Sequence, residues 1–127
     1  MKNKRKPLVI NHPTIVPFDT DLTLIDYSVN GRDPKDLVKI GLIPGKEILV
    51  YPIKESIDML KNMYASKFYI IVWSASGVDW AKHVVKRLKL EDYVDMIITK
   101  PRFYVDDTDA DEWMKRLYRY PPYIKKE

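Results

Sequence analysis

The chain has 127 residues, no cysteine and a net charge of +4. This length suffices for one domain with a core of its own, and the lack of cysteine excludes disulfides, thiolate metal sites and a cysteine nucleophile. No apolar run reaches the roughly 20 residues that a membrane span needs, and the basic N-terminus lacks the long apolar region of a signal peptide. We therefore expect a protein without membrane contact, and a reducing cytoplasm suits it.

The positive charge is concentrated at the two ends of the sequence. Residues 1–6 and 115–127 together contribute +8, so residues 7–114 sum to −4. We predict one domain over 1–127 with a basic N-terminal arm at 1–12 and a basic C-terminal tail at 119–127. The acidic body argues against a broad nucleic-acid-binding face and fits a body that gathers carboxylates at a cation site, although the tails can still steer a polyanion.

An apolar run at residues 15–18 ends in Asp19 and Asp21. If the run is a buried strand, Asp19 lies at its carboxyl end, where open α/β sheets bind ligands. Two carboxylates there can bind a hard cation, or one can attack while the other moves a proton. Asp and Thr after a strand are also ordinary turn and cap residues, so the motif needs partners elsewhere in the chain.

Residues 26–50 form the least regular part of the sequence. They contain the turn signals Asn30-Gly31, Asp33-Pro34 and Pro44-Gly45, with a short strand predicted at 46–51. We expect a loop or hairpin insertion beside Asp19 and Asp21. The roughly 28 residues between the Asp19 motif and the helix predicted at 53–65 are too few for a large cap domain.

Alternating helices and strands are predicted after this insertion. Apolar spacing predicts helices over 53–65, from about Ala81 to Leu88 and over 110–117, the second with Ser76 as its N-cap. Residues 68–73 are an unbroken apolar run, typical of a strand buried on both faces. Short apolar runs follow at 96–98 and 103–105. This order predicts an α/β fold, a three-layer α/β/α Rossmann-like domain with a mainly parallel sheet.

The link at residues 99–102 conflicts with two regular strands around it. If 96–98 is an edge strand and 103–105 pairs beside the first strand, the link must cross about 14 Å of sheet before it returns along the sheet. Four residues cannot do this. We therefore predict that 96–98 is not a regular strand.

Three of the predicted strands end in polar side chains: Asp19, Ser74 and the pair Asp106-Asp107. Carboxyl ends of parallel strands share one edge of the sheet, and Lys100 falls between the last two. Each residue alone has an ordinary interpretation as a turn, cap or surface residue. Together they suit phosphoryl transfer, in which carboxylates bind Mg²⁺ while Lys and Ser bind phosphoryl oxygens.

The order Asp-x-Asp-x-Thr-Leu, Ser74, Lys100 and Asp106-Asp107 resembles the haloacid dehalogenase-like (HAD) phosphohydrolase superfamily over about residues 15–117. The segment from Trp73 to Ala81 also looks like the second motif of its carboxy-terminal-domain phosphatase branch. Leu22 stands where many members of the superfamily have glycine. The resemblance implies a capless HAD-like fold.

The resemblance also implies a role for each motif residue. Asp19 would be the nucleophile and a Mg²⁺ ligand, and Asp21 the general acid/base with its backbone carbonyl on the metal. Ser74 and Lys100 would hold the phosphoryl group. The carboxylates of the fourth motif would be Asp107 as a metal ligand, with Asp106 and Asp111 in support.

The expected function is Mg²⁺-dependent hydrolysis of a phosphomonoester through an aspartyl-phosphate. The substrate class stays open among nucleotides, nucleic-acid ends and phosphoproteins. One alternative is a non-catalytic or regulatory binding module on the same fold. Another is a nucleic-acid-binding protein that acts through its basic tails, which steep salt dependence would reveal.

Overall fold

The computed structural model describes residues 5–28, 32–41 and 45–117. Within these residues, a parallel sheet has the strand order β1 (Ile15–Asp19), β5 (Tyr69–Ser74), β6 (Met96–Thr99). A separate antiparallel sheet has the order β2 (Ile25–Asp26), β4 (Ile48–Pro52), β3 (Val38–Ile40). The α-helices are α1 (Lys54–Ala65) and α2 (Val78–Arg87), and three short 3-10 turns are η1 (Pro34–Asp36), η2 (Glu91–Tyr93) and η3 (Ala110–Glu112).

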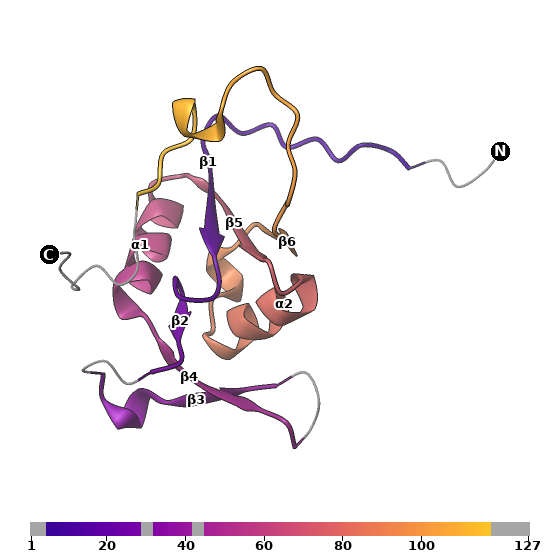
Figure 1. The fold of residues 1–127 in the computed structure, drawn as a ribbon. Helices are drawn as coiled ribbons and strands as arrows, with labels where there is room; N and C mark the ends of the chain where they lie inside the picture. Colours follow the sequence, from indigo (N-terminus) through magenta and orange to yellow (C-terminus); the bar gives the residue numbers. More distant parts are fainter. Residues whose placement is uncertain (1–4, 29–31, 42–44, 118–127) are drawn as a thin grey trace, which may run out of the picture.

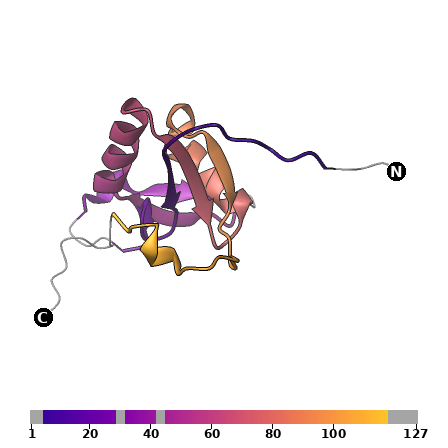
Figure 2. The ribbon, with the colours of Figure 1, turned by 90° about the horizontal axis from the view of Figure 1, so that it is seen from above.

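Both α-helices cover the same face of the parallel sheet (Figure 2). Leu60 of α1 and Val85 of α2 share one core cluster with Val72 of β5. The strand order runs in one direction from β1 to β5 to β6, and right-handed crossovers then place successive helices on one face. The α/β class is confirmed, whereas the predicted three layers are wrong for the described residues, which place two α-helices on one side only.

Residues 100–117, which we call the arch, pass over the other face of the sheet (Figures 1 and 2). The predicted strand at 103–105 is wrong: Phe103 is 89% exposed, Val105 is fully exposed, and neither is in a strand. The predicted helix at 110–117 is also wrong, since only the turn η3 forms. A short amphipathic segment depends on a core to bury its apolar face, and here that face stays largely exposed.

The short link after β6 explains why the arch is irregular. β6 is a regular strand whose pairing with β5 runs from Ile71↔Met96 to Ser74↔Thr99, so the prediction that 96–98 is not a strand is wrong. Four residues still cannot carry the chain to the far side of β1 as a parallel strand. The segment that is not part of the sheet is therefore 103–105, and not 96–98.

Helix α2 packs between two hydrophobic clusters. Ala81 and Val85 join the cluster on the parallel sheet, while Trp80 and Val84 join a second cluster with Ile40 and the antiparallel sheet. The two pairs lie on adjacent stripes of the helix, each with the i, i+4 spacing of one helical face. The predicted second helix, the helix at 53–65 and the strand at 68–73 are confirmed as α2, α1 and β5. Burial of β5 alternates, however, so only one of its faces is fully covered.

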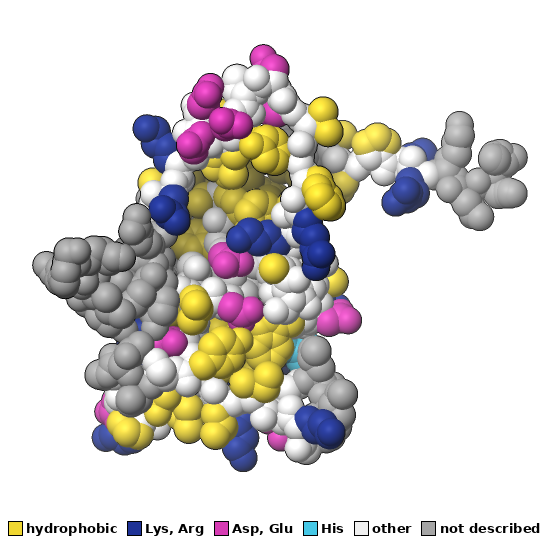
Figure 3. Space-filling model, in the orientation of Figure 1, with side chains coloured by type: hydrophobic (Ala, Val, Ile, Leu, Met, Phe, Trp, Pro, Cys, Tyr) yellow, Lys and Arg dark blue, Asp and Glu magenta, His cyan; other side chains and the backbone are white. Residues whose placement is uncertain are grey.

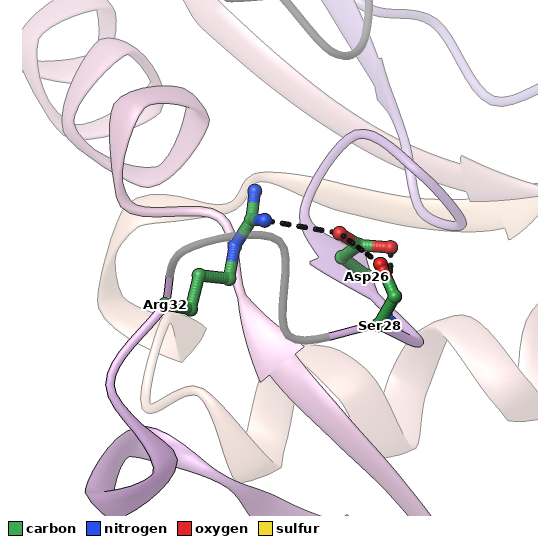
Figure 4. A network of polar contacts seen from close by, with 3 residues as sticks. All are labelled: Asp26, Ser28 and Arg32. Atoms are coloured by element: carbon green, nitrogen blue, oxygen red, sulfur yellow. Dashed lines mark hydrogen bonds and ion pairs between the residues drawn. The ribbon is translucent and has the colours of Figure 1, made fainter.

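The insertion at 26–50 contains the antiparallel sheet, and its predicted strand at 46–51 is β4. Its buried carboxylate, Asp26, pairs with Arg32 over 3.0 Å and accepts hydrogen bonds from Ser28 (Figure 4). This network joins Ser28 and Arg32 to Asp26 at the end of β2. The predicted arm at 1–12 is described only from Arg5 onward, and the predicted tail at 119–127 lies outside the described residues.

No described helix is long and apolar enough to cross a membrane.

One core hydroxyl in α1 offers a test of the packing. Ser56 is buried, and its Oγ has no hydrogen-bond partner among the described residues. An unsatisfied buried hydroxyl costs about 1–3 kcal/mol, and alanine keeps the helix with a better propensity. We expect Ser56→Ala to raise the free energy of unfolding measured in urea. A loss of stability would show that the hydroxyl has a partner in solution.

Candidate functional site

A pocket of about 580 Å³ opens at the carboxyl end of β1 and extends along that strand. Its walls come from β1, the loop after it, Trp73, two methionines of α1 and the arch. Figure 3 shows hydrophobic side chains inside the hollow, acidic side chains on the arch above it and Lys or Arg side chains beside the opening. We call it the Asp19 pocket, since Asp19, Asp21 and Lys100 all line it.

Asp19 and Lys100 form an ion pair in this pocket. The distance from Lys100 Nζ to Asp19 Oδ2 is 3.8 Å, and both side chains are partly exposed, by 42% and 35%. The backbone N–H of Lys100 donates to the Ser74 carbonyl over 2.9 Å, which carries the ladder between β5 and β6 one residue past the strand. The sheet thus fixes the start of the lysine side chain, while the charged end can reach either Asp19 or an anion.

The loop from Thr20 to Ile25 positions Asp21. Thr20 is fully buried; its Oγ1 donates to the Trp73 carbonyl over 2.8 Å, and its own carbonyl accepts three backbone N–H groups of the loop. Leu22 has φ = +63°, a left-handed conformation that costs a non-glycine residue about 1–2 kcal/mol. The chain therefore holds strain immediately after Asp21.

Replacing Leu22 by glycine is expected to maintain or raise the free energy of unfolding. Relief of the left-handed strain offsets the extra backbone entropy of glycine, roughly 0.5–1 kcal/mol. The same change at Thr23, which lacks a positive φ, should lower stability. Urea unfolding of both variants is the measurement. Equal losses would show that the loop adopts another backbone conformation.

Three donors hold the Asp21 carboxylate. Tyr27 Oη and Trp80 Nε1 donate to Oδ1 over 2.6 and 3.0 Å, and Ser76 Oγ donates to Oδ2 over 3.3 Å. The predicted N-cap role of Ser76 is wrong: Gly77 occupies that position, with φ = +114° and without a side-chain cap. The serine instead orients a carboxylate from another element.

Tyr27 carries the strongest electrostatic signature of the site. Tyr27 is 47% exposed, and its partial burial, the hydrogen bond to Asp21 and the negative charge of that carboxylate all raise its pKa above the ordinary value. Each cause disfavours the phenolate.

The raised pKa predicts a loss of stability at alkaline pH. Between the unfolded pKa of about 10 and the higher folded pKa, the folded state binds the extra proton, so stability falls as pH rises. We expect wild-type protein to lose stability relative to Tyr27→Phe above about pH 10. Below that pH the difference between the two proteins should be constant. A stability difference that stays constant above pH 10 as well would contradict the raised pKa of Tyr27. As a second test, the absorbance change from tyrosinate formation should be equal in both proteins up to about pH 11, because Tyr27 is not yet ionised there.

Ser74 takes a different position from the one its predicted role requires. It is fully buried and does not line the Asp19 pocket. Its Oγ accepts the Ser76 N–H over 3.0 Å, and its carbonyl accepts from Gly77 and Lys100. In this arrangement Ser74 shapes the turn that carries Ser76 and Lys100, and its hydroxyl is closed to a phosphoryl group.

Asp106 and Asp107 lie on the arch in a second pocket, lined also by Tyr104, Thr108 and other arch residues. The pKa of the exposed Asp106 is lowered, mainly by the hydrogen bond that its carboxylate accepts from the Thr108 backbone N–H and next by a hydrogen bond with the Asp107 side chain. Asp111 lies in η3 and lines neither pocket. The structure therefore does not bring these three carboxylates to Asp19, because the strand that would carry them there is not formed.

Mg²⁺ usually binds one or two carboxylates together with waters and substrate phosphate. At the Asp19 pocket the carboxylates are Asp19 and Asp21, and Asp21 already accepts three hydrogen bonds. Residues 5–28, 32–41 and 45–117 contain no cluster of three or more His, Cys, Asp or Glu side chains that could hold a metal. The three-aspartate site implied by the resemblance does not fit this arrangement, and a magnesium requirement stays a prediction.

Sequence reasoning missed Tyr27 as a partner of Asp21. It also missed the indole N–H of Trp80, whose ring is buried, with 7% of the residue exposed. The only signal in the sequence was the position of Trp80 in a segment similar to the second motif. No signal pointed to Tyr27, because its contact depends on the turn that follows Asp21.

No family model, curated protein or solved structure matches this chain, so the likeness to the HAD superfamily rests on the motif residues alone.

Proposed function

We propose that this chain is a phosphomonoester hydrolase in which Asp19 is the nucleophile. The observation that carries the proposal is the pairing of Asp19 with Lys100 at the carboxyl edge of the parallel sheet, in one pocket with Asp21. A carboxylate able to attack phosphorus needs a nearby cation to bind the phosphoryl oxygens, and an acid to protonate the leaving group. These residues supply all three.

The reaction has two steps. Asp19 Oδ attacks phosphorus while Lys100 binds a phosphoryl oxygen, and the bond to the leaving-group oxygen breaks as the protonated form of Asp21 gives its proton to that oxygen. Asp21, now a carboxylate, then takes a proton from water as the water oxygen attacks phosphorus. The bond from phosphorus to Asp19 Oδ breaks, which releases inorganic phosphate and restores the Asp19 carboxylate and the protonated Asp21. We assign the proton transfers to Asp21 Oδ2, because its bond to Ser76 is the longest of the three on that carboxylate.

Magnesium belongs to this proposal as a predicted requirement. Phosphate release should be measured with Mg²⁺ and with EDTA, on an aryl phosphate, nucleotides, end-phosphorylated oligonucleotides and a phosphopeptide. Metal-dependent release would support the proposal. If Asp107→Asn loses the metal-dependent phosphate release, Asp107 is a ligand of the metal. If Asp107→Asn releases phosphate as wild type does at every Mg²⁺ concentration, Asp107 is not part of the site.

A binding module without catalysis is the second candidate. It is favoured by the separation of Asp107 from Asp19, which occupy different pockets. A folded protein that binds inorganic phosphate through Lys100 and turns over none of the substrates would support this candidate.

A further inference from the structure

The Asp19 pocket is much larger than a phosphoryl group requires. From Asp19 it extends along β1 between the sheet and the arch, to a total of about 580 Å³. Pockets that enclose small organic ligands span about 300–1,000 Å³. Most of this volume is therefore left for whatever the phosphoryl group is attached to.

Apart from its charged groups, the pocket is lined mainly with apolar side chains. They include Pro17 of β1, Trp73 beside Asp19 on β5, Met59 and Met63 of α1, and Met114 and Leu117 of the arch. Methionine side chains adapt to irregular ligands and contact aromatic rings favourably. A polar leaving group such as a sugar would lose hydration against these apolar side chains.

The pocket exists because nothing in the described chain pairs with the outer edge of β1. Pro17 lies in the middle of this edge and lacks a backbone N–H, and proline on an edge strand disfavours addition of another strand. The edge is thus better suited to an apolar group than to a peptide. Lys100, Lys115 and Arg116 also line the pocket and outnumber its two carboxylates, Asp19 and Asp21, so the net charge of the lining favours an anionic ligand.

We propose that the substrates of this chain are phosphomonoesters with an apolar leaving group, which lies between β1 and the arch. This inference rests on the proposed function for the position of the phosphoryl group. The leaving group would contact Trp73 of β5, Met63 of α1 and Met114 of the arch.

Binding of alkylphosphonates tests the proposal without turnover. Dissociation constants for methyl-, butyl- and hexylphosphonate would be measured by calorimetry on the full chain. Affinity should rise roughly two- to fourfold for each methylene that enters the pocket. Met114→Gln should flatten the series. Val105→Gln, on the same arch but outside the pocket and fully exposed, should leave it as steep as in wild type.

Equal affinity for all three phosphonates would overturn the inference, as would a series equally steep in Met114→Gln and wild type. The outcome for the proposed function is separate. Turnover that needs Asp19, combined with a flat series, would keep the hydrolase and remove the apolar specificity. A steep series in a protein without turnover would keep the apolar pocket and remove the hydrolase.

Discussion

Asp19→Asn is expected to lower turnover of a phosphomonoester by about 10³-fold or more, because the amide cannot form the aspartyl-phosphate. The fold should survive, since asparagine has nearly the same shape. The substitution removes the ion pair of Asp19 with Lys100, which is partly exposed, and partly exposed ion pairs contribute little to stability. Phosphate release under single-turnover and steady-state conditions is the measurement.

Asp58→Asn is the matched control for this variant. Asp58 is an exposed aspartate on α1 that does not line the Asp19 pocket, so its activity should equal that of wild type. If Asp19→Asn and Asp58→Asn had the same turnover, Asp19 would not be the nucleophile.

Removal of the Asp26 carboxylate is expected to have the largest effect on stability. The Asp26 side chain is 4% exposed and that of Arg32 12%, and their charged atoms are 3.0 Å apart. Deleting one member of a buried ion pair costs about 3–5 kcal/mol, because the other charge stays in a poorly solvated place. The free energy of unfolding of a domain is about 5–15 kcal/mol, so Asp26→Ala should be only marginally stable.

The control is the ion pair of Lys54 with Asp36, also at 3.0 Å, whose side chains are 69% and 33% exposed. Asp36→Ala should change stability little, because solvent screens exposed pairs. Urea unfolding followed by circular dichroism compares the two variants. A similar small loss in both would mean that the buried network of Figure 4 contributes no more than a surface pair.

Those parts of the fold that depend on local periodicity could be predicted from the sequence. Helix α1 and strands β1 and β5 occur where helical spacing or apolar runs indicate them, and β6 also follows an apolar run, although it was wrongly excluded as a strand. The arch could not be predicted from local pattern, because residues 103–105 have the composition of a strand. Their structure follows from chain reach, since the short link after β6 prevents a return across two strands.

In the candidate site, too, the features set by the strands could be predicted, and those set by tertiary packing could not. The rule that parallel strands share a carboxyl edge correctly placed Asp19 and Lys100 in one pocket, although their roles stay a proposal. The partners of Asp21 depend on a left-handed Leu22 and on the packing of Trp80, neither of which a strand rule describes. Ser74 lies at the predicted edge, yet its hydroxyl faces the backbone of its own turn.

Trapping of a phosphorylated intermediate tests the central claim most directly. A reacting mixture of the full chain and a phosphomonoester would be quenched with acid, digested and analysed by mass spectrometry, with hydroxylamine treatment to confirm an acyl phosphate. We predict a phosphoryl group on Asp19, absent from Asp19→Asn. Turnover in wild type without this adduct, or with the phosphoryl group on another residue, would contradict the account.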